Sequence, residues 1–404
     1  MDLLQPVIRP YAWGSWDAIA ELQGRTVPAD GPEAELWMGA HPSAPSGLSR
    51  NGVVTTLDAV IARDPARELG TECVARYGGR LPFLLKVLSA ESALSIQVHP
   101  SRAQAETGYA EEKARGLTAG DPSRNYVDNW PKPELLCAIT SFEVLAGMRD
   151  PADAAALLKA LAGQQPALVR LAPVTGSLAA SAADPRVVSC ALASILAWPA
   201  EDRTALVDDV VAACTRLAAE DGPYAAACAA IARVSADHPG DIGVVAALLL
   251  RHAVLAPGQA VFMPAGGLHA YLRGTGVELL ANSDNVVRAG LTGKHIDVPE
   301  LLKLLDPSVA VPAIEPAEWA PRVVTYATPA PEFKLYRADL DTEMTGLPGA
   351  GPRIVLCVEG SATLKDSSGE VTEVDRGESC FLSDTDGSVS ASGPARLFLA
   401  TTGN

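Results

Sequence analysis

Four side chains in three short segments have the types and spacing of a metal site. In "LSIQVHPS", Gln97 and His99 are two residues apart, so both project from one face of a strand. Glu134 begins "ELLCAIT", and His269 follows a Gly-Gly turn in "MPAGGLHAYL". Two imidazoles, a carboxylate and an amide oxygen could together hold a divalent metal and leave room for water or substrate.

The residue pattern by itself is compatible with more than one role for these side chains. Polar and apolar residues alternate from Leu94 to His99, so one face of this strand must meet water, a ligand or a metal. A single histidine on a strand is more often a hydrogen-bonded structural residue than a ligand, and a long stretch of chain separates His99 from His269. We interpret the remaining histidines as structural: His41, His238, His252 and His295.

Short β-type segments surround the candidate ligands. Up to residue 149, "LPFLLKVL", "LSIQVHP" and "ELLCAIT" are separated by Gly and Pro, which predicts short strands. Strand character returns in "GQAVFMPAGGLHAYL" and "GVELLANS". Between them the chain is Ala-rich, and "DPADAAALLKALAG" opens with Asp and Pro and closes on Gly, which predicts a helix. The later "DIGVVAALLLRHAVL" is also helix-like.

The C-terminal part of the chain again predicts strands. Segments such as "RIVLCVEGSATLKD" and "ARLFLATT" alternate with turn residues, which is typical of a small antiparallel barrel or sandwich. The Pro-rich "DPSVAVPAIEPAEWAP" is expected to be a linker. We therefore expect a mainly β fold with an α insertion: a discontinuous β-barrel domain over 1–149 and 241–312, a helical insertion domain over 150–240, and a C-terminal β domain over 313–404.

Composition and charge exclude several classes of protein. The chain has 404 residues, of which 48% are hydrophobic, and a formal net charge of −16. A chain this acidic is not expected to bind nucleic acid or an anionic membrane. The most apolar run, Val244 to Gly258, is interrupted by Arg251 and His252 and is shorter than the ~20 apolar residues that span a bilayer.

The N-terminus and the cysteines indicate a cytoplasmic protein. "MDLLQPVIRPYAWGS" has neither the basic nor the apolar region of a secretory signal. The 7 cysteines are an odd, scattered set without a CxxC pair, so we expect reduced and mostly buried thiols.

Several segments together resemble the type I mannose-6-phosphate isomerases, a family of the cupin superfamily. They are "ELWMGAHPSAPS", "LPFLLKVLSAESALSIQVHPS", "KPELLCAIT", "HPGDIGVVAALLL" and "GLHAYLRGTGVELLANSDNVVRAGLTGK", in family order. "SDNVVRAGLT" is the most specific, because it is long and unlike a generic barrel strand. The resemblance implies a cupin-type β-barrel catalytic domain and a C-terminal cupin-like β domain.

The resemblance also implies a cofactor and a reaction. In the family, zinc is held by residues that correspond to Gln97, His99, Glu134 and His269, with one ion per chain. The family members interconvert mannose 6-phosphate and fructose 6-phosphate through a cis-enediol. That reaction needs a cation or Lewis acid at the sugar oxygens and a base near the carbons. The implied partner is a small phosphosugar; the oligomeric state is left open, with a monomer as one option.

Residues near the candidate ligands could carry the proton transfer. Arg288 is suited to stabilise enediolate charge, because a guanidinium stays charged and offers a planar fork of donors. Lys132, Glu278 and Asp284 are candidates for moving protons or for orienting the groups that do. Each also has a possible structural role: a salt-bridge partner, a solvated strand residue and a turn cap, respectively.

The substrate phosphate requires local cations, because salt screens charges beyond about 8 Å. Lys86, on the strand before the Gln97 strand, and Ser95, on the polar face of that strand, can reach the same pocket. Lys294 is a second cationic candidate, and Tyr271 of "HAYL" is expected to contact the substrate.

The sequence departs from the family pattern at two positions. The family usually has His immediately before the Lys of its KPE segment, whereas this chain has Pro131, so no proton transfer can depend on that position. The family's TPK reads "LTGK", with Gly293 in place of Pro, which we expect to change only loop stiffness.

Two functions of other classes remain alternatives at this point. A metal-dependent cupin oxygenase also uses strand histidines and a glutamate, but "SDNVVRAG" argues against it. A non-catalytic sugar-binding cupin is expected to lack an intact ligand set and an arginine in the pocket. A bifunctional relative with a nucleotidyltransferase is disfavoured, because no "GGxGxR" loop is present.

Overall fold

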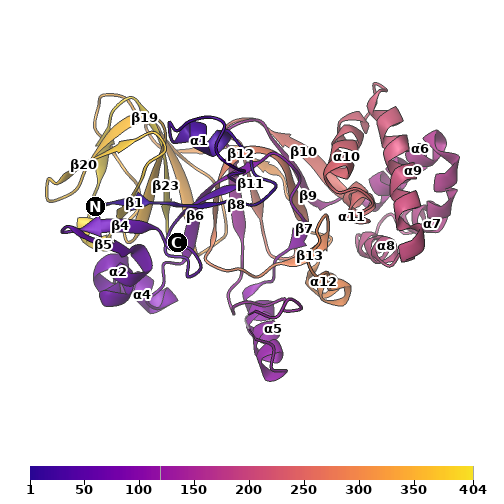
Figure 1. Ribbon diagram of the computed structural model, residues 1–404, viewed down its shortest axis with the longest axis horizontal. Helices are drawn as coiled ribbons and strands as arrows, with labels where there is room; N and C mark the ends of the chain where they lie inside the picture. The colour runs from indigo at the N-terminus through magenta and orange to yellow at the C-terminus, as the bar shows by residue number, and fades with distance from the viewer. Residues whose placement is uncertain (119, 404) are drawn as a thin grey trace.

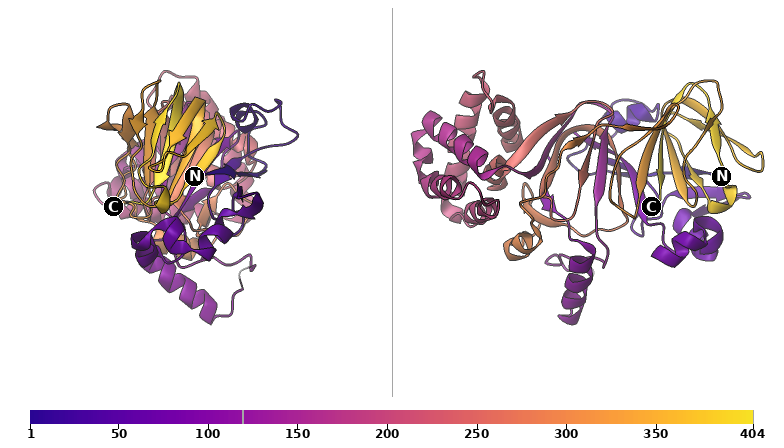
Figure 2. Two further views of the ribbon diagram at one scale, coloured as in Figure 1. Left: turned by 90° about the vertical axis from the view of Figure 1, so that its left-hand side faces the viewer. Right: turned by 180° about the vertical axis from the view of Figure 1, so that it is seen from behind.

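The molecule consists of two β units that lie side by side and a helical bundle at one end. The computed structural model describes residues 1–118 and 120–403. In Figure 1 the C-terminal strands lie on the left, the first β unit in the centre and the helices of the insertion on the right. The same order is seen from behind in Figure 2. The predicted mainly β fold with a helical insertion is confirmed.

The first β unit is an antiparallel sheet of 11 strands. Its strands are β2 (Val7–Arg9), β3 (Glu35–Met38), β6 (Phe83–Ala90), β7 (Ile96–Val98), β8 (Glu134–Ala138), β9 (Phe142–Met148), β10 (Leu250–Leu255), β11 (Ala260–Met263), β12 (His269–Ala281), β13 (Val287–Gly290) and β14 (Ala313–Ile314). Glu134 and His269 each begin a strand, as the sequence predicted.

Strand β12 joins the two halves of this unit. Its first residues pair with β7 and β9, and the residues from Gly274 onward pair with β6 and β8. Gly274 has φ 130°, and a Cβ there would lie 2.6 Å from the backbone oxygen of Ser141. Only glycine fits this close approach, so Gly274 permits the change of partners along one strand.

The second β unit is a sheet of 12 strands that also includes the start of the chain. Its strands are β1 (Asp2–Gln5), β4 (Gly47–Arg50), β5 (Val53–Thr56), β15 (Ala317–Ala320), β16 (Val323–Thr325), β17 (Lys334–Asp339), β18 (Thr345–Gly346), β19 (Arg353–Lys365), β20 (Val371–Asp375), β21 (Ser379–Leu382), β22 (Ser390–Ser392) and β23 (Ala395–Thr401).

Two expectations about the ends of these sheets need correction. The predicted boundaries assign β1, β4 and β5 to the first unit, but β1 pairs with β21 and β4 in the second. Local composition does not reveal such long-range pairing. The expected linker around residues 306–321 contains β14, which pairs with β11, and the edge strand β15. Edge strands tolerate the prolines that suggested a linker.

The insertion is helical throughout its described length. Its elements are α6 (Pro151–Gln164), η1 (Pro166–Leu171), α7 (Ala172–Ala180), α8 (Arg186–Leu196), α9 (Ala200–Ala218), α10 (Ala225–Asp237), α11 (Gly243–Ala246) and η2 (Ala247–Leu249). Helix α6 begins at Pro151, as predicted. The helix expected over "DIGVVAALLLRHAVL" ends at Leu249, because the following residues pair with β9 as β10.

The remaining helices decorate the two β units. They are α1 (Ala18–Leu22), α2 (Leu57–Arg63), α3 (Pro65–Leu69), α4 (Thr71–Tyr77), α5 (Arg102–Ala114), α12 (Val298–Leu304) and η3 (Asp384–Asp386). Helix α5 projects away from the first unit in Figure 1. None of the helices in the described part of the chain combines the length and hydropathy that a membrane crossing requires.

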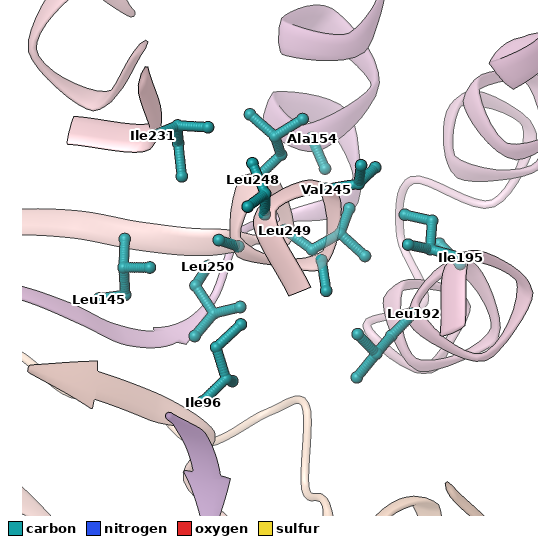
Figure 3. Packing of buried hydrophobic residues seen from close by; sticks show 14 of the residues in the cluster. Ile96, Leu145, Ala154, Leu192, Ile195, Ile231, Val245, Leu248, Leu249 and Leu250 are labelled. Carbon is teal, nitrogen blue, oxygen red and sulfur yellow. The ribbon is translucent and has the colours of Figure 1, made fainter. Parts of the chain in front are cut away.

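One hydrophobic core connects the first β unit with the helical insertion. Figure 3 shows Ile96 and Leu145 from the strands packed near Leu248 and Leu250 and near residues of the helices. The apolar residues of β7 and β13, including Val98 and Val287, belong to the same cluster. The insertion therefore supports the back of two strands whose other faces carry Gln97 and Arg288.

Candidate metal centre and active-site cleft

Three predicted ligands converge at the ends of three strands, since His99 follows β7 and Glu134 and His269 begin β8 and β12. The Nε2 atom of His99 lies 3.3 Å from one carboxylate oxygen of Glu134, and Nε2 of His269 lies 3.4 Å from the other. One potential ligand atom from each residue lies within 4.8 Å of the others. All three side chains are buried, so they form a compact cluster shielded from solvent.

The hydrogen bonds of the two imidazoles orient them for metal binding. Nδ1 of His99 donates to the backbone carbonyl of Asn285 (2.8 Å), and Nδ1 of His269 donates to that of Gly267 (3.1 Å). With the proton held on Nδ1, each Nε2 presents its lone pair to the centre of the cluster. Nε2 of His99 and Oε2 of Glu134 are buried without a hydrogen-bond partner, as atoms that await a cation would be.

The electrostatics of the cluster keep its donor atoms unprotonated. Burial lowers the pKa of His99 to about 4, with Lys132 and His269 acting in the same direction. Burial alone would raise the pKa of Glu134, but His99 and Lys132 hold it well below its ordinary value. A neutral imidazole and an ionised carboxylate are the forms that bind a metal.

Gln97, the fourth predicted ligand, lies beside this cluster. It lies opposite His269 across β7 and β12, and its amide nitrogen is 3.4 Å from Nε2 of His269. A half-turn of the amide exchanges its nitrogen and oxygen, so the oxygen can face the same centre. In that orientation Gln97 would add a second oxygen donor to the two nitrogens and one carboxylate of the cluster, and its role as a ligand stays a prediction.

A cleft of about 780 Å³ opens above this cluster. Every predicted site residue except the fully buried His99 and His269 lines the cleft. These lining residues are Lys86, Ser95, Gln97, Lys132, Glu134, Tyr271, Glu278, Asp284, Arg288 and Lys294. Segments distant in the sequence are therefore brought to one place by the sheet.

Lys86 lies in the interior between two carboxylates. Its ammonium is 3.4 Å from Glu35 and 3.3 Å from Glu278, and it lies 4.9 Å from the ring centre of Trp37. Burial acts to lower the pKa of Lys86, but Glu35 and Glu278 raise it overall. Since its charge is already balanced, Lys86 is poorly placed to neutralise a second anion.

Glu278 could exchange protons near neutral pH. Burial raises the pKa of Glu278 to about 7, with help from Glu134 and against the opposing effect of Lys86. Tyr271 is buried, and burial raises its pKa well above the ordinary value, with Glu134 and Glu278 adding to the shift. The Lys132 ammonium lies 3.1 Å from a carboxylate oxygen of Glu134.

Asp284 is held by a histidine that the sequence suggested to be structural. Nε2 of His41 lies 3.3 Å from the Asp284 carboxylate, while the Ser43 hydroxyl lies 2.8 Å from Nδ1. Burial acts to raise the pKa of Asp284, but the hydrogen bond from His41 lowers it below the ordinary value. Asp284 therefore faces the cleft as an oriented carboxylate rather than as a simple turn cap.

Arg288 and Lys294 are the cations of the cleft that lack a carboxylate partner within the described residues. Burial lowers the pKa of Arg288, and no charged neighbour contributes to the shift. Burial also lowers the pKa of Lys294, assisted by the charge of Arg288. Two positive charges without a carboxylate partner favour an anion in the cleft that both line, and Ser95 lines the same cleft.

Sequence reasoning missed four residues that shape the site. Glu35 and Trp37 line the cleft beside Lys86, His41 orients Asp284, and Asn285 holds His99. All four lie inside "ELWMGAH" and "SDNVVRAG", segments that carried the family resemblance. Only Glu35 and Trp37 had a local signal in the sequence. They are two residues apart on a strand, which places both side chains on one face.

Comparison with known proteins identifies relatives of nearly the same length. Residues 1–151 match the family model described as phosphomannose isomerase type I, catalytic domain. The mannose-6-phosphate isomerase of Salmonella typhimurium is 36% identical over 400 residues, which cover 98% of each chain. Mannose-6-phosphate isomerase 2 of Arabidopsis thaliana is 33% identical and covers 94% of this chain and 88% of its own.

Solved structures agree with these sequence relatives. A crystal structure of mannose 6-phosphate isomerase from Salmonella typhimurium, bound to its substrate F6P and to zinc, has a TM-score of 0.88 and 34% identity and covers 100% of both chains. A zinc-bound holo structure has a TM-score of 0.88 and covers 100% of this chain and 99% of its own. The predicted cupin-type fold is thereby confirmed. The chain belongs to the type I mannose-6-phosphate isomerase family.

Proposed function

We propose that this protein is a zinc-dependent aldose–ketose isomerase that interconverts mannose 6-phosphate and fructose 6-phosphate through a cis-enediol. The observation that carries the proposal is the convergence of His99, Glu134 and His269 beneath a cleft with two unbalanced cations. The family relationship supports the same reaction.

The metal would be held by Gln97, His99, Glu134 and His269. The donor set fits zinc, which takes imidazole and carboxylate ligands and is redox-silent. When bound, zinc supplies a Lewis acid that polarises the sugar oxygens. Lys132 lies against Glu134 and would keep this carboxylate ionised and oriented.

The phosphate of the substrate would lie at the end of the cleft formed by Ser95 and Lys294, with Arg288 between this end and the metal. The two cations have no competing carboxylate among the described residues, and a phosphate dianion would balance their charge. The sequence predicts that Lys86 binds the phosphate. We propose instead that Lys86 serves as the ion-pair partner of the carboxylates Glu35 and Glu278.

Isomerisation requires two balanced proton movements. The C2 proton of the aldose passes to a base and returns to C1, while the O2 hydroxyl proton is lost and O1 gains one. Glu278 is suited to accept and return a proton, because its raised pKa brings the two forms close to balance near neutral pH. Asp284 and Tyr271 lie along the same cleft and can hold the hydroxyl groups.

Arg288 would stabilise the intermediate. A developing enediolate is more negative than the ground-state carbonyl, so a fixed guanidinium contributes most in the transition state. A cation exposed to water stabilises the enediolate less, because water weakens the electrostatic attraction. Arg288 is partly buried in the cleft, so its attraction is stronger.

The proposal is tested by assaying the purified protein in both directions with metal analysis of the same sample. We expect interconversion of the two phosphosugars, one zinc per chain, loss of activity with a chelator and recovery with zinc. Mannose without its phosphate is the matched control and should react poorly. Zinc-loaded, folded protein that leaves both phosphosugars unchanged would refute the proposed function.

The expected cellular context follows from the thiols. All 7 cysteines are free, and only Cys190 is exposed. Disulfide-free cysteines in this number are typical of reducing compartments, which supports a cytoplasmic location. The expected partner is the small phosphosugar. The sequence left the oligomeric state open, and the monomer that it allowed stays a prediction.

A further inference from the structure

The segment where the helical insertion returns to the first β unit touches the phosphate end of the cleft. Helix α10 ends at Asp237, His238 follows, and both side chains line the cleft together with Ser95 and Lys294. These residues come from a helical segment that supplies no metal ligand and none of the proposed proton-transfer groups.

Two consecutive residues of this segment hold one residue of the Ser95 loop. The Asp237 carboxylate accepts a hydrogen bond from the backbone N–H of Ala93 (3.3 Å), and Nε2 of His238 donates to the backbone carbonyl of Ala93 (2.9 Å). Ala93 is 3% exposed. Both polar groups of a buried peptide residue are therefore satisfied by the insertion, which fixes the loop two residues before Ser95.

The same segment also holds the loop that carries Lys294. One carboxylate oxygen of Asp241 accepts from the backbone N–H of Thr292 (3.0 Å), and the other accepts from that of Gly243 (2.7 Å). The Thr292 hydroxyl in turn accepts from the backbone N–H of Lys294 (3.1 Å). The cation is thus connected to the insertion through one intervening residue.

The backbones of the two elements touch at this point. A Cβ on Gly243 would lie 2.8 Å from the Cα of Gly290, and a Cβ on Gly290 would lie 2.5 Å from the Cα of Gly243. Gly290 ends β13 shortly after Arg288. This close contact, together with the shared hydrophobic core, leaves the segment little freedom to move relative to the cleft.

We propose that residues 237–243 determine the affinity for the phosphate end of the substrate by positioning the Ser95 and Lys294 loops, with Asp237, His238 and Asp241 as the positioning residues. The inference rests on the proposed function for the location of the phosphate. It assigns the helical insertion a role in substrate recognition, although no side chain of the insertion needs to touch the phosphate.

The geometry determines which kinetic constant should change. Displacing a loop by a fraction of an ångström weakens a charge-assisted contact to phosphate but leaves the metal ligands in place. His238→Ala and Asp237→Ala should therefore each raise KM for the phosphosugar and the inhibition constant of inorganic phosphate by about three- to tenfold, the effect of one lost hydrogen bond. Values of kcat and zinc content should stay near wild type.

Two further variants separate positioning from general loosening. His238→Gln keeps an N–H donor that can reach the Ala93 carbonyl, so it should recover much of the lost phosphate affinity. Tyr224→Phe removes a hydrogen bond to Asp153 (3.1 Å) at the opposite end of α10 and should leave phosphate affinity unchanged. Circular dichroism and thermal unfolding would be recorded for all variants.

The outcomes distinguish this inference from the proposed function. An inactive wild-type protein would refute the isomerase assignment. An active wild type with unchanged phosphate constants in His238→Ala and Asp237→Ala would overturn the positioning role alone. The role would also be overturned by an equal loss of phosphate affinity in Tyr224→Phe, or by loss of zinc and kcat without any change in KM.

Discussion

Arg288 lies directly opposite Gln97 across β13 and β7. Gln97 in turn lies opposite His269 across β7 and β12, so the arginine is separated from one predicted metal ligand by a single strand and directly adjoins another predicted ligand. Side chains at such opposed positions have Cβ atoms about 5 Å apart. The guanidinium is therefore placed beside the metal centre without being part of it.

This position predicts a selective loss of rate when Arg288 is truncated. Arg288→Ala should lower kcat by about 10²–10³, as expected for removal of one preorganised donor, and raise KM far less. Arg288→Lys should recover little, because a point charge cannot reproduce the planar fork. Steady-state kinetics with zinc analysis measure both effects; near-normal kcat in folded, zinc-loaded Arg288→Ala would exclude the role.

The metal centre predicts that metal and activity are lost together. His269→Ala should remove a ligand from a buried cluster and abolish both zinc binding and turnover. His252→Ala is the matched control, since His252 pairs with Glu143 at 2.7 Å and lies outside the cluster. Metal content by mass spectrometry should fall only in the first variant. Stoichiometric zinc in His269→Ala would contradict the ligand assignment.

The raised pKa of Glu278 predicts a pH limb in the activity. Burial raises this pKa to about 7, so the carboxyl is protonated below that pH and able to accept a proton above it. Values of kcat/KM should therefore rise as pH increases through about 7, and Glu278→Gln should lose most activity together with this limb. Besides burial, the charged groups that shift this pKa are Lys86, Glu134, Glu35 and Lys132, and Glu278 in turn raises the pKa of Tyr271.

A pH profile of kcat/KM, recorded at saturating zinc for wild type and Glu278→Gln, measures the limb. If the variant keeps the same rise near neutral pH, another group carries the titration, and Glu278 is not the base.

The unbalanced charge of Lys294 predicts a loss of substrate affinity on its removal. Lys294→Ala should raise KM by an amount that corresponds to roughly 1.5–3 kcal/mol for a charge-assisted contact, and Ser95→Ala should raise KM less. Lys303→Ala is the control, because Lys303 is exposed and pairs with Glu300 at 3.3 Å. Equal KM values for Lys294→Ala and Lys303→Ala would place the phosphate elsewhere.

The sequence pointed to His99, Glu134 and His269, which the structure groups as a possible metal site, because their signal is local. The two-residue spacing of Gln97 and His99 and the strand starts at Glu134 and His269 are visible in short segments, and the structure places Gln97 opposite His269. The charge state of the cleft was not visible. Cross-strand neighbours determine how many carboxylates surround each lysine. Glu278, for example, lies opposite Lys86, whereas Lys294 has no carboxylate near it within the described residues.

The histidines illustrate the same limit. His252 and His238 have hydrogen-bonding roles, as the structural interpretation expects. The same interpretation applied to His41, yet this residue orients a carboxylate of the cleft from another part of the chain. Residue type and spacing predict what a side chain can do, whereas its partner depends on long-range strand pairing.

Strand β1 lies between β21 and β4, so the earliest residues of the chain complete a sheet whose other strands come largely from its last quarter. During synthesis, an N-terminal segment usually begins to fold before the rest of the chain has emerged from the ribosome. Here one edge of β1 must wait for Ser379–Leu382, and until then it presents unpaired backbone groups that favour aggregation. A chain that stops before β21 would leave this strand paired only with β4, so correct folding of the first residues depends on translation of the last ones.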